Sequence, residues 1–100
     1  MTKPRIAVIG CGGMGRAHAW GIQGYGGLDF VAAADPVSAA RDEMKKIAPA
    51  VRLYSDATEM LARERADLVV VATATAQHGA LTLAALRAGA HVLCEKPMAV

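Results

Sequence analysis

Three glycines near the amino terminus have a spacing that suits phosphate binding. Gly10, Gly12 and Gly15 form the pattern G-x-G-x-x-G directly after the apolar residues 6–9. The first glycine of such a pattern allows a tight turn, the second lets the backbone approach a ligand, and the third lets a helix pack closely on the strand. Amide N–H groups and the positive end of the helix dipole would then face a pyrophosphate. The other residues of this predicted binding loop are Cys11, Gly13 and Met14.

An acidic residue lies at the expected distance beyond the glycine loop. Asp35 follows Gly15 by 20 residues and comes directly after a second apolar run, 30–34. At about this distance, an Asp or Glu of a dinucleotide-binding domain accepts hydrogen bonds from the adenosine ribose. Its negative charge disfavours a 2′-phosphate, so Asp35 favours NAD over NADP. Two simpler interpretations stay open: a generic tight turn for the glycines, and a helix cap before Pro36 for Asp35.

A second group of polar residues follows two later apolar strands. Its members are Thr73, Thr75 and His78 after the run 68–72, and Glu95 and Lys96 after the run 91–94. Ligands of open α/β sheets bind beyond the carboxyl ends of the strands, where both segments are expected. A lysine there can donate a hydrogen bond to a substrate oxygen, or transfer a proton if its pKa is lowered. Alternatively, Lys96 is a solvated partner of Glu95, and His78 only occupies the first turn of a helix.

Composition limits the classes of function. The 100 residues allow one domain, and they are 54% hydrophobic but 4% aromatic. The net charge is only +2 and the basic residues are scattered, so we expect no nucleic-acid partner. Cys11 and Cys94 lie far apart and form no metal-ligand spacing, so we expect free thiols and no metal. No apolar stretch is long enough to cross a membrane, and we expect a cytoplasmic location.

Strand and helix patterns alternate along the whole chain. Apolar runs without polar alternation are typical of parallel strands covered on both faces, so the sequence predicts an α/β fold with a doubly wound parallel sheet in the order 3-2-1-4-5. Predicted strands are 5–9, 30–34, 51–54, 68–72 and 91–94, and predicted helices are 13–23, 37–47, 56–63 and 77–88. In the first helix, Met14, His18, Gly21 and Ile22 share one face. In the fourth helix, Thr75 is the expected N-cap.

Several segments together resemble one family. They are 6–15, Ala33 to Pro36, 67–72, the loop ending in His78, and above all the run Gly89-Ala90-His91-Val92-Leu93-Cys94-Glu95-Lys96-Pro97. In this order they resemble the glucose–fructose oxidoreductase/inositol dehydrogenase (Gfo/Idh/MocA) family. The final run is much more specific than the glycine loop. The resemblance covers essentially the whole chain and implies a Rossmann domain that binds NAD, or less favourably NADP.

The resemblance also implies an activity and roles for single residues. Members of this family are NAD(P)-dependent oxidoreductases that act mostly on sugars, cyclitols and related polyols. Lys96 matches the active-site lysine of the family, His78 matches its histidine after the fourth strand, and Glu95 lies in the loop near the nicotinamide. Where the family usually has proline after Thr73, this chain has Ala74, so the loop lacks that rigid residue.

Expectations for the whole protein also follow from the resemblance. Residues 1–100 are interpreted as a Rossmann domain that is incomplete at its carboxyl end, because such a domain normally has six strands and the sequence predicts five. The second domain of the family, which supplies further catalytic residues and most oligomer contacts, is not among these residues either. The full-length protein is expected to be a homo-oligomer with a small sugar or polyol substrate. Two other functions remain possible for this fold: a glycosidase that uses tightly bound NAD for transient oxidation, and a non-catalytic dinucleotide-sensing module.

Overall fold

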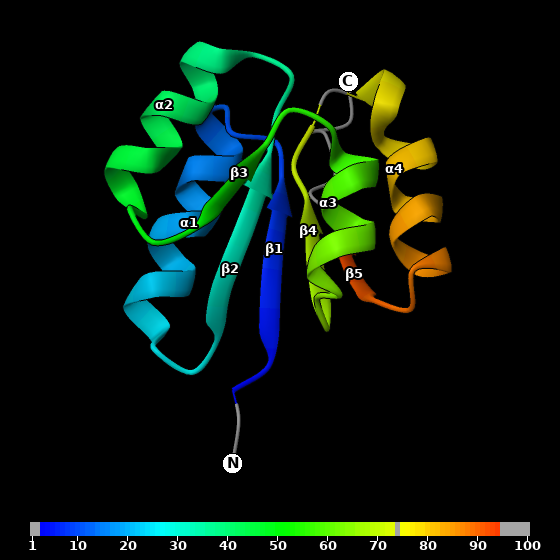
Figure 1. The fold of residues 1–100 in the computed structure, drawn as a ribbon, viewed down its shortest axis with the longest axis horizontal. Coiled ribbons are helices and arrows are strands. Elements are labelled where there is room, and N and C mark those ends of the chain that lie inside the picture. The colour runs from blue at the N-terminus through cyan, green and yellow to red at the C-terminus, as the bar shows by residue number, and fades with distance from the viewer. Residues whose placement is uncertain (1–2, 74, 95–100) are drawn as a thin grey trace.

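A computed structural model describes residues 3–73 and 75–94 of the chain as one parallel sheet flanked by helices (Figure 1). The five strands have the order β3-β2-β1-β4-β5, and every neighbouring pair is parallel. This confirms the predicted doubly wound topology. The elements are β1 (Arg5–Ile9), α1 (Gly13–Tyr25), β2 (Asp29–Ala34), α2 (Ser38–Ile47), β3 (Arg52–Tyr54), α3 (Ala57–Glu64), β4 (Leu68–Val71), α4 (Thr75–Arg87) and β5 (His91–Cys94).

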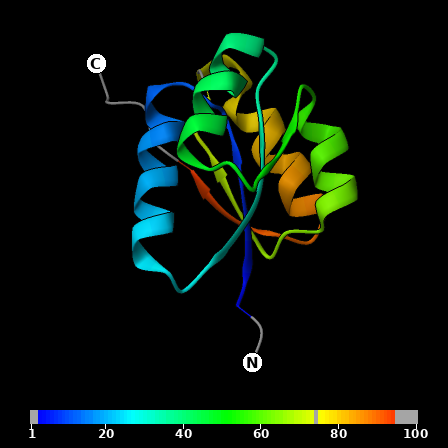
Figure 2. The same ribbon diagram turned by 60° about the vertical axis from the view of Figure 1, so that its left-hand side comes forward.

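The continuous apolar character of the strands reflects burial on both faces of the sheet. Ile6 and Val8 of β1 pack in one core with residues of α1 and α2, whereas Ala7 and Ile9 pack in a second core with residues of α3 and α4. Successive side chains of a strand point to opposite faces, so a strand between two helical layers needs apolar residues at every position. Figure 2 shows the helices on the two sides of the sheet.

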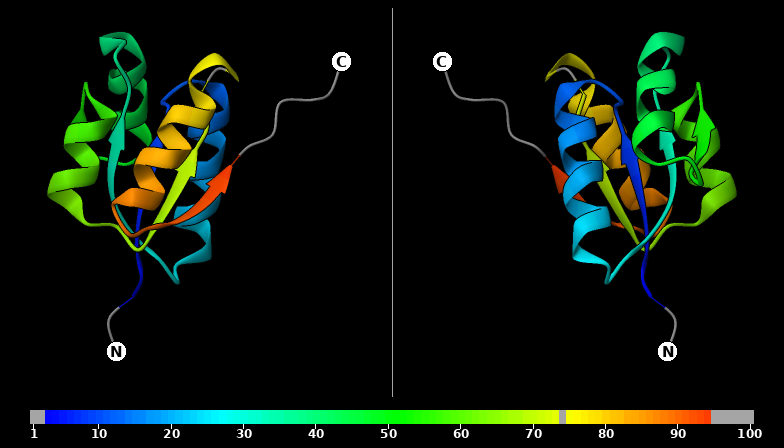
Figure 3. Two further views of the ribbon diagram at one scale, coloured as in Figure 1. Left: turned by 90° about the vertical axis from the view of Figure 1, so that its right-hand side faces the viewer. Right: turned by 90° about the vertical axis from the view of Figure 1, so that its left-hand side faces the viewer.

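The carboxyl ends of the strands meet at one edge of the sheet, as the parallel arrowheads in Figure 3 show. Main-chain hydrogen bonds continue the sheet slightly beyond the strands: the N–H of Gly10 donates to Ala34 O at 2.7 Å, and that of Ala72 donates to Ile9 O at 2.8 Å. The N–H of Asp35 likewise donates to Tyr54 O at 3.0 Å. The segments that follow β1, β2, β3 and β4 are therefore held side by side.

Two helices differ from the prediction. Helix α4 begins at Thr75, two residues before the predicted start at 77, and Thr75 is the first helical residue instead of the N-cap. Ala76 and Gln77 have high helix propensity, so the local sequence does not oppose the longer helix. In α1 the buried residues are Gly15, Ala19 and Ile22, and Met14 is 45% exposed, so the predicted inner face was wrong in part.

The reason lies in residue size. Gly15 and Ala19 are too small to stand out in an apolar pattern, but they let α1 approach the sheet closely. Trp20, whose hydrophobic character suggests burial, is 65% exposed on this helix. In the described parts of the chain, none of the helices has both the length and the apolar character required to span a membrane.

Candidate dinucleotide-binding site

The turn between β1 and α1 requires glycine at its first position. Gly10 has φ +108°, a backbone conformation that residues with a side chain rarely adopt. A Cβ atom at Gly10 would also lie 2.4 Å from Ala72 O, directly after the neighbouring strand β4. The first glycine of the motif therefore allows the chain to turn sharply while β1 stays close to β4.

The other two glycines of the motif face different surroundings. A Cβ atom at Gly15 would lie 1.7 Å from Gly10 O, so this glycine permits the close packing of α1 on the turn. A Cβ atom at Gly12 or Gly13 would meet no atom within 4 Å. Gly12 is the N-cap of α1, and the first turn of the helix contains no acidic residue. The N–H groups of that turn have no intrahelical partners, so an anion can bind there.

Asp35 connects the glycine turn to the start of α2. Its Oδ2 accepts a hydrogen bond from the N–H of Cys11 at 2.8 Å, and its Oδ1 accepts one from the N–H of Val37 at 2.8 Å. The second bond closes the turn that precedes α2. Asp35 is not the helix cap that the sequence left open, because the N-cap of α2 is Val37 and has no side-chain cap hydrogen bond. A carboxylate has roughly four acceptor positions, so two remain for the hydroxyl groups of a ribose.

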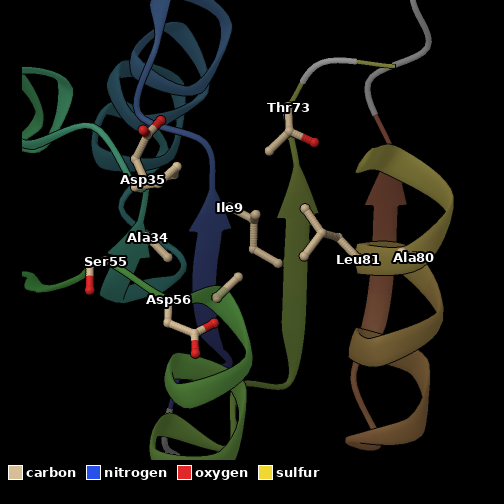
Figure 4. A pocket seen from close by; sticks show the side chains of 10 residues that line it. Ile9, Ala34, Asp35, Ser55, Asp56, Thr73, Ala80 and Leu81 are labelled. Atoms are coloured by element: carbon tan, nitrogen blue, oxygen red, sulfur yellow. The ribbon is translucent and has the colours of Figure 1, made fainter. Parts of the chain in front are cut away.

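A cavity of about 440 Å³ opens beside Asp35 at this edge of the sheet. Asp35, Ser55 and Asp56 lie on one side of it, and Thr73 and Leu81 lie on the other (Figure 4). Ile9, Ala34, Pro36, Ala57 and Ala80 complete the lining. Small-molecule pockets commonly have volumes of about 300–1,000 Å³ and are mostly apolar with few polar groups, so this cavity is large enough for an adenosine group.

Thr73 contributes an unpaired polar atom to this site. Its Oγ1 is buried and has no hydrogen-bond partner among the described residues. A buried hydroxyl without a partner costs roughly 1–3 kcal/mol, so a ligand that pairs with it gains binding free energy. The open space at Gly12, the free acceptor positions of Asp35 and this hydroxyl together fit an adenine dinucleotide.

Several residues of the site were not identified from the sequence. Ser55 and Asp56 line the cavity because they follow β3, and the rule that ligands bind beyond strand ends would have identified them. Asp56 begins the predicted helix 56–63, and in the structure it is the N-cap of α3: its Oδ1 accepts a hydrogen bond from the N–H of Thr58 at 2.9 Å. Arg16 donates from Nη1 to Cys11 O at 2.9 Å and thereby holds the glycine turn. Its sequence position gives no signal of this contact.

Cys11 is the buried residue at the centre of the turn. Its side chain is fully buried, and it is a free thiol. Burial, and secondarily the nearby carboxylate of Asp35, raise the pKa of this thiol to about 11. The thiol therefore stays protonated at neutral pH and is a poor nucleophile. Its contribution to the candidate site is the backbone N–H that orients Asp35.

The second group of predicted residues is only partly described by the structure. Thr73 follows β4 and lines the cavity, Thr75 begins α4, and His78 lies in the first turn of that helix. Glu95 and Lys96 lie outside the described residues, immediately after β5. The roles predicted for these five residues stay predictions.

The sheet order, the glycine turn, the acidic residue after β2 and the cavity beside it together define a Rossmann-type dinucleotide-binding fold. The chain belongs to the Gfo/Idh/MocA family. The model of that family, described as an oxidoreductase family with an NAD-binding Rossmann fold, matches residues 4–100. This match confirms the resemblance that was based on the glycine loop and on the run 89–97.

Individual relatives agree with the family assignment. The chain is 38% identical to an inositol 2-dehydrogenase of Agrobacterium fabrum over 97 residues, which cover 95% of the chain and 29% of the relative. It is 35% identical to a D-apiose dehydrogenase of Paraburkholderia graminis, over an alignment that covers 94% of the chain and 25% of the relative. A structure of scyllo-inositol dehydrogenase from Lactobacillus casei, with bound NAD(H) and scyllo-inositol, superposes on this chain with a TM-score of 0.87. The two sequences are 28% identical, and the superposition covers 99% of this chain and 29% of the dehydrogenase. The chain thus spans less than a third of the length of these relatives.

Proposed function

We propose that this chain is the NAD-binding part of a dehydrogenase that acts on a secondary alcohol of a cyclitol, sugar or related polyol. The observation that carries the proposal is the adenosine-sized cavity bordered by Asp35, beside a glycine turn with open space at Gly12. The names of the relatives support the class of substrate, because two of them are an inositol 2-dehydrogenase and a D-apiose dehydrogenase.

Each part of the adenosine diphosphate group has a matching feature on the chain. The N–H groups that begin α1, next to Gly12 and Gly13, suit the pyrophosphate because they carry partial positive charge and have no side chain in front of them. The free acceptor positions of Asp35 suit the ribose hydroxyl groups. The cavity between Ser55 and Leu81 suits the adenine ring, whose flat faces need apolar walls.

The chemical step involves residues at the carboxyl end of β5. When bound, NAD supplies the hydride acceptor for an alcohol carbon or, in its reduced form, the hydride for a ketone. We propose that Lys96 donates a hydrogen bond to the reacting oxygen of the substrate, and that Glu95 and His78 lie near the nicotinamide end of the site. An ammonium group in this position lowers the free energy of developing negative charge on that oxygen.

The test separates binding from turnover. This chain is titrated with NAD by calorimetry. Oxidation of myo-inositol, scyllo-inositol and D-apiose is followed in the full-length protein through the absorbance of NADH, because residues 1–100 alone are not expected to turn over substrate. We expect NAD binding and net NADH formation with at least one of the polyols. The Lys96→Ala variant should keep the NAD affinity within about twofold while losing at least about 100-fold in kcat.

Two results contradict the proposal. Absence of NAD binding would remove the assignment of the site. Binding with bond cleavage in a glycoside but no net NADH would support the NAD-dependent glycosidase instead, because such an enzyme regenerates its cofactor in every cycle.

A further inference from the structure

Arg41 extends back from α2 to the turn that carries Asp35. Its Nη1 donates a hydrogen bond to the main-chain oxygen of Asp35 at 2.7 Å, and its side chain is half-buried. In the part of the chain that the structure describes, no ion pair joins this guanidinium to the Asp35 carboxylate. The guanidinium is therefore held against the main chain of the residue whose carboxylate is assigned to the ribose, and the two charged groups do not pair directly.

The carboxylate of Asp35 is held separately from Arg41. Each of its oxygens accepts a backbone N–H, from Cys11 and from Val37, and both distances are 2.8 Å. These two bonds fix the orientation of the carboxylate, so it cannot turn toward the guanidinium without losing one of them. The carboxylate of the β2–α2 turn and the guanidinium that reaches this turn from α2 are consequently each held by their own hydrogen bonds.

The charges of Asp35 and Arg41 both act on the buried thiol of Cys11. Its pKa is raised by burial and by the Asp35 carboxylate, and it is lowered by the charges of Arg41 and Arg16. Arg41 and Asp35 therefore act electrostatically on the same point of the glycine turn, with opposite signs.

The chemical difference between the two nicotinamide cofactors lies at this turn. NADP carries a phosphate on the 2′-oxygen of the adenosine ribose, where NAD has a hydroxyl group. A carboxylate repels that phosphate, and an arginine near the same position binds it through charge-assisted hydrogen bonds. The guanidinium of Arg41 has five N–H donors, of which the bond to Asp35 uses one. The first turn of α2 adds no acidic side chain.

We propose that Arg41 is a specificity-determining residue, which gives this site affinity for a 2′-phosphate and limits the discrimination that Asp35 imposes against NADP. The proposal rests on the proposed function, because it assumes that adenosine occupies the cavity beside Asp35. The chain then prefers NAD but retains measurable affinity for NADP, and it loses that affinity when Arg41 is removed.

The test compares the two cofactors in a small set of variants. Dissociation constants of NAD and NADP, and of the fragments 5′-AMP and 2′,5′-ADP, are measured by calorimetry for the natural chain, Arg41→Met and Asp35→Asn. We expect Arg41→Met to weaken the binding of NADP and 2′,5′-ADP by about five- to tenfold, while the affinities for NAD and 5′-AMP change by less than about twofold. Asp35→Asn should raise the affinity for NADP by about tenfold, and combining it with Arg41→Met should remove that increase.

Two further variants separate direct recognition from net charge and from structural damage. Lys45→Met removes one exposed charge from α2 a single turn further along and should leave the ratio of NAD to NADP affinity unchanged. Arg41→Lys retains the charge and should restore part of the NADP affinity. Equal losses for both cofactors in Arg41→Met would overturn the proposal and leave Arg41 as a structural residue. If neither NAD nor 5′-AMP bound the natural chain, the proposed function itself would fail.

Discussion

Gly12 and Gly15 lack side chains for different physical reasons. A Cβ atom at Gly15 would meet the carbonyl oxygen of Gly10 at 1.7 Å, so the fold itself excludes a side chain there. A Cβ atom at Gly12 would meet nothing within 4 Å, so the fold leaves that space open. The absence of a side chain at Gly12 is thus best explained by a ligand that approaches the backbone.

Gly12→Val is predicted to abolish cofactor binding without preventing folding. The added isopropyl group enters the open space in front of the helix amino terminus, so we expect NAD affinity to fall by at least about 100-fold, or about 2.7 kcal/mol. The free energy of unfolding should change by about 1 kcal/mol, since valine is a poorer N-cap than glycine. Calorimetry with NAD and urea unfolding measure the two effects.

Two other glycines of α1 serve as comparisons. Gly15→Ala should reduce the free energy of unfolding by about 3 kcal/mol or more, because the new methyl group overlaps the main chain. Gly21→Val introduces the same side chain as Gly12→Val at an exposed position of α1 with open space around it, and it should leave NAD affinity unchanged. Unaltered NAD affinity in Gly12→Val would show that this turn does not bind the pyrophosphate.

The buried thiol of Cys11 should make the stability of the fold depend on pH in the alkaline range. Its pKa is about 11 in the folded chain, compared with an ordinary value of 9.0, mainly because of burial. The unfolded chain therefore loses this proton at lower pH than the folded chain. The contribution of the neutral thiol to the free energy of unfolding is therefore complete below pH 9.0 and is lost as the pH rises toward about 11.

Urea unfolding across the alkaline range measures this effect of Cys11. The free energy of unfolding of the natural chain should fall between pH 9.0 and about 11, and Cys11→Ala should show a smaller slope over the same interval. A thiol reagent should also modify Cys11 slowly in the folded chain and rapidly in urea. Identical slopes in the two proteins would mean that burial does not hold the thiol in its neutral form.

Buried Glu64 joins α3 to the edge strand β3. Its carboxylate receives two hydrogen bonds of 2.6 Å from Arg52 and one of 2.5 Å from the hydroxyl of Tyr54. Arg5 of β1 donates to Glu64 O at 2.7 Å and thus connects a third element. The three-residue strand β3 is therefore anchored at both of its ends, and Ser55 and Asp56, which follow it, are held beside the cavity.

Glu64→Gln is predicted to destabilise the chain in a pH-dependent way. The hydrogen bonds from Arg52 lower the pKa of Glu64 below its ordinary value of 4.5, despite the opposing effect of burial. The ionised carboxylate therefore stabilises the fold above that value, and the contribution disappears as the pH falls through the lowered pKa. At about pH 7 the substitution should cost about 1–3 kcal/mol, because it weakens charge-assisted hydrogen bonds.

The matched control for Glu64→Gln is Glu59→Gln on the same helix. Glu59 is half-exposed and pairs with Arg63 at 3.4 Å, so its substitution should cost less than about 0.5 kcal/mol. Urea unfolding of both variants at about pH 7, and again well below 4.5, tests the prediction. Equal costs of the two substitutions, or a cost of Glu64→Gln that persists in acid, would contradict it.

The limits of prediction from sequence are clearest at the scale of elements. Apolar runs identify all five strands, because strands buried on both faces leave a continuous signal, and β1 and β5 match their predicted bounds. The glycine motif and the spacing to Asp35 identify the turn because both are patterns of residues that lie close together in the sequence. The contacts of Glu64 with Arg5 and Arg52, and of Arg41 with Asp35, give no such signal. They depend on which elements the sheet brings together and on the direction of long side chains.

At the scale of the whole molecule, the candidate site belongs to no single element. The glycine turn follows β1, Asp35 follows β2, Ser55 follows β3, and Thr73 follows β4. Unfolding of the sheet separates these four segments, so NAD can bind only to the folded chain. Binding free energy therefore adds directly to the free energy of unfolding.

Thermal unfolding with and without cofactor tests this coupling. At a NAD concentration of about 100 times Kd, we expect the stability to rise by about 2.7 kcal/mol. For a domain of this size, each kcal/mol raises Tm by roughly 4–8 °C, so the total increase should be about 10–20 °C. NADP at the same concentration should raise Tm by less because of Asp35, and the Gly12→Val chain should respond to neither. Equal shifts with NAD and NADP would contradict the expected net preference for NAD. A NAD shift that persists in Gly12→Val would locate the cofactor elsewhere on the molecule.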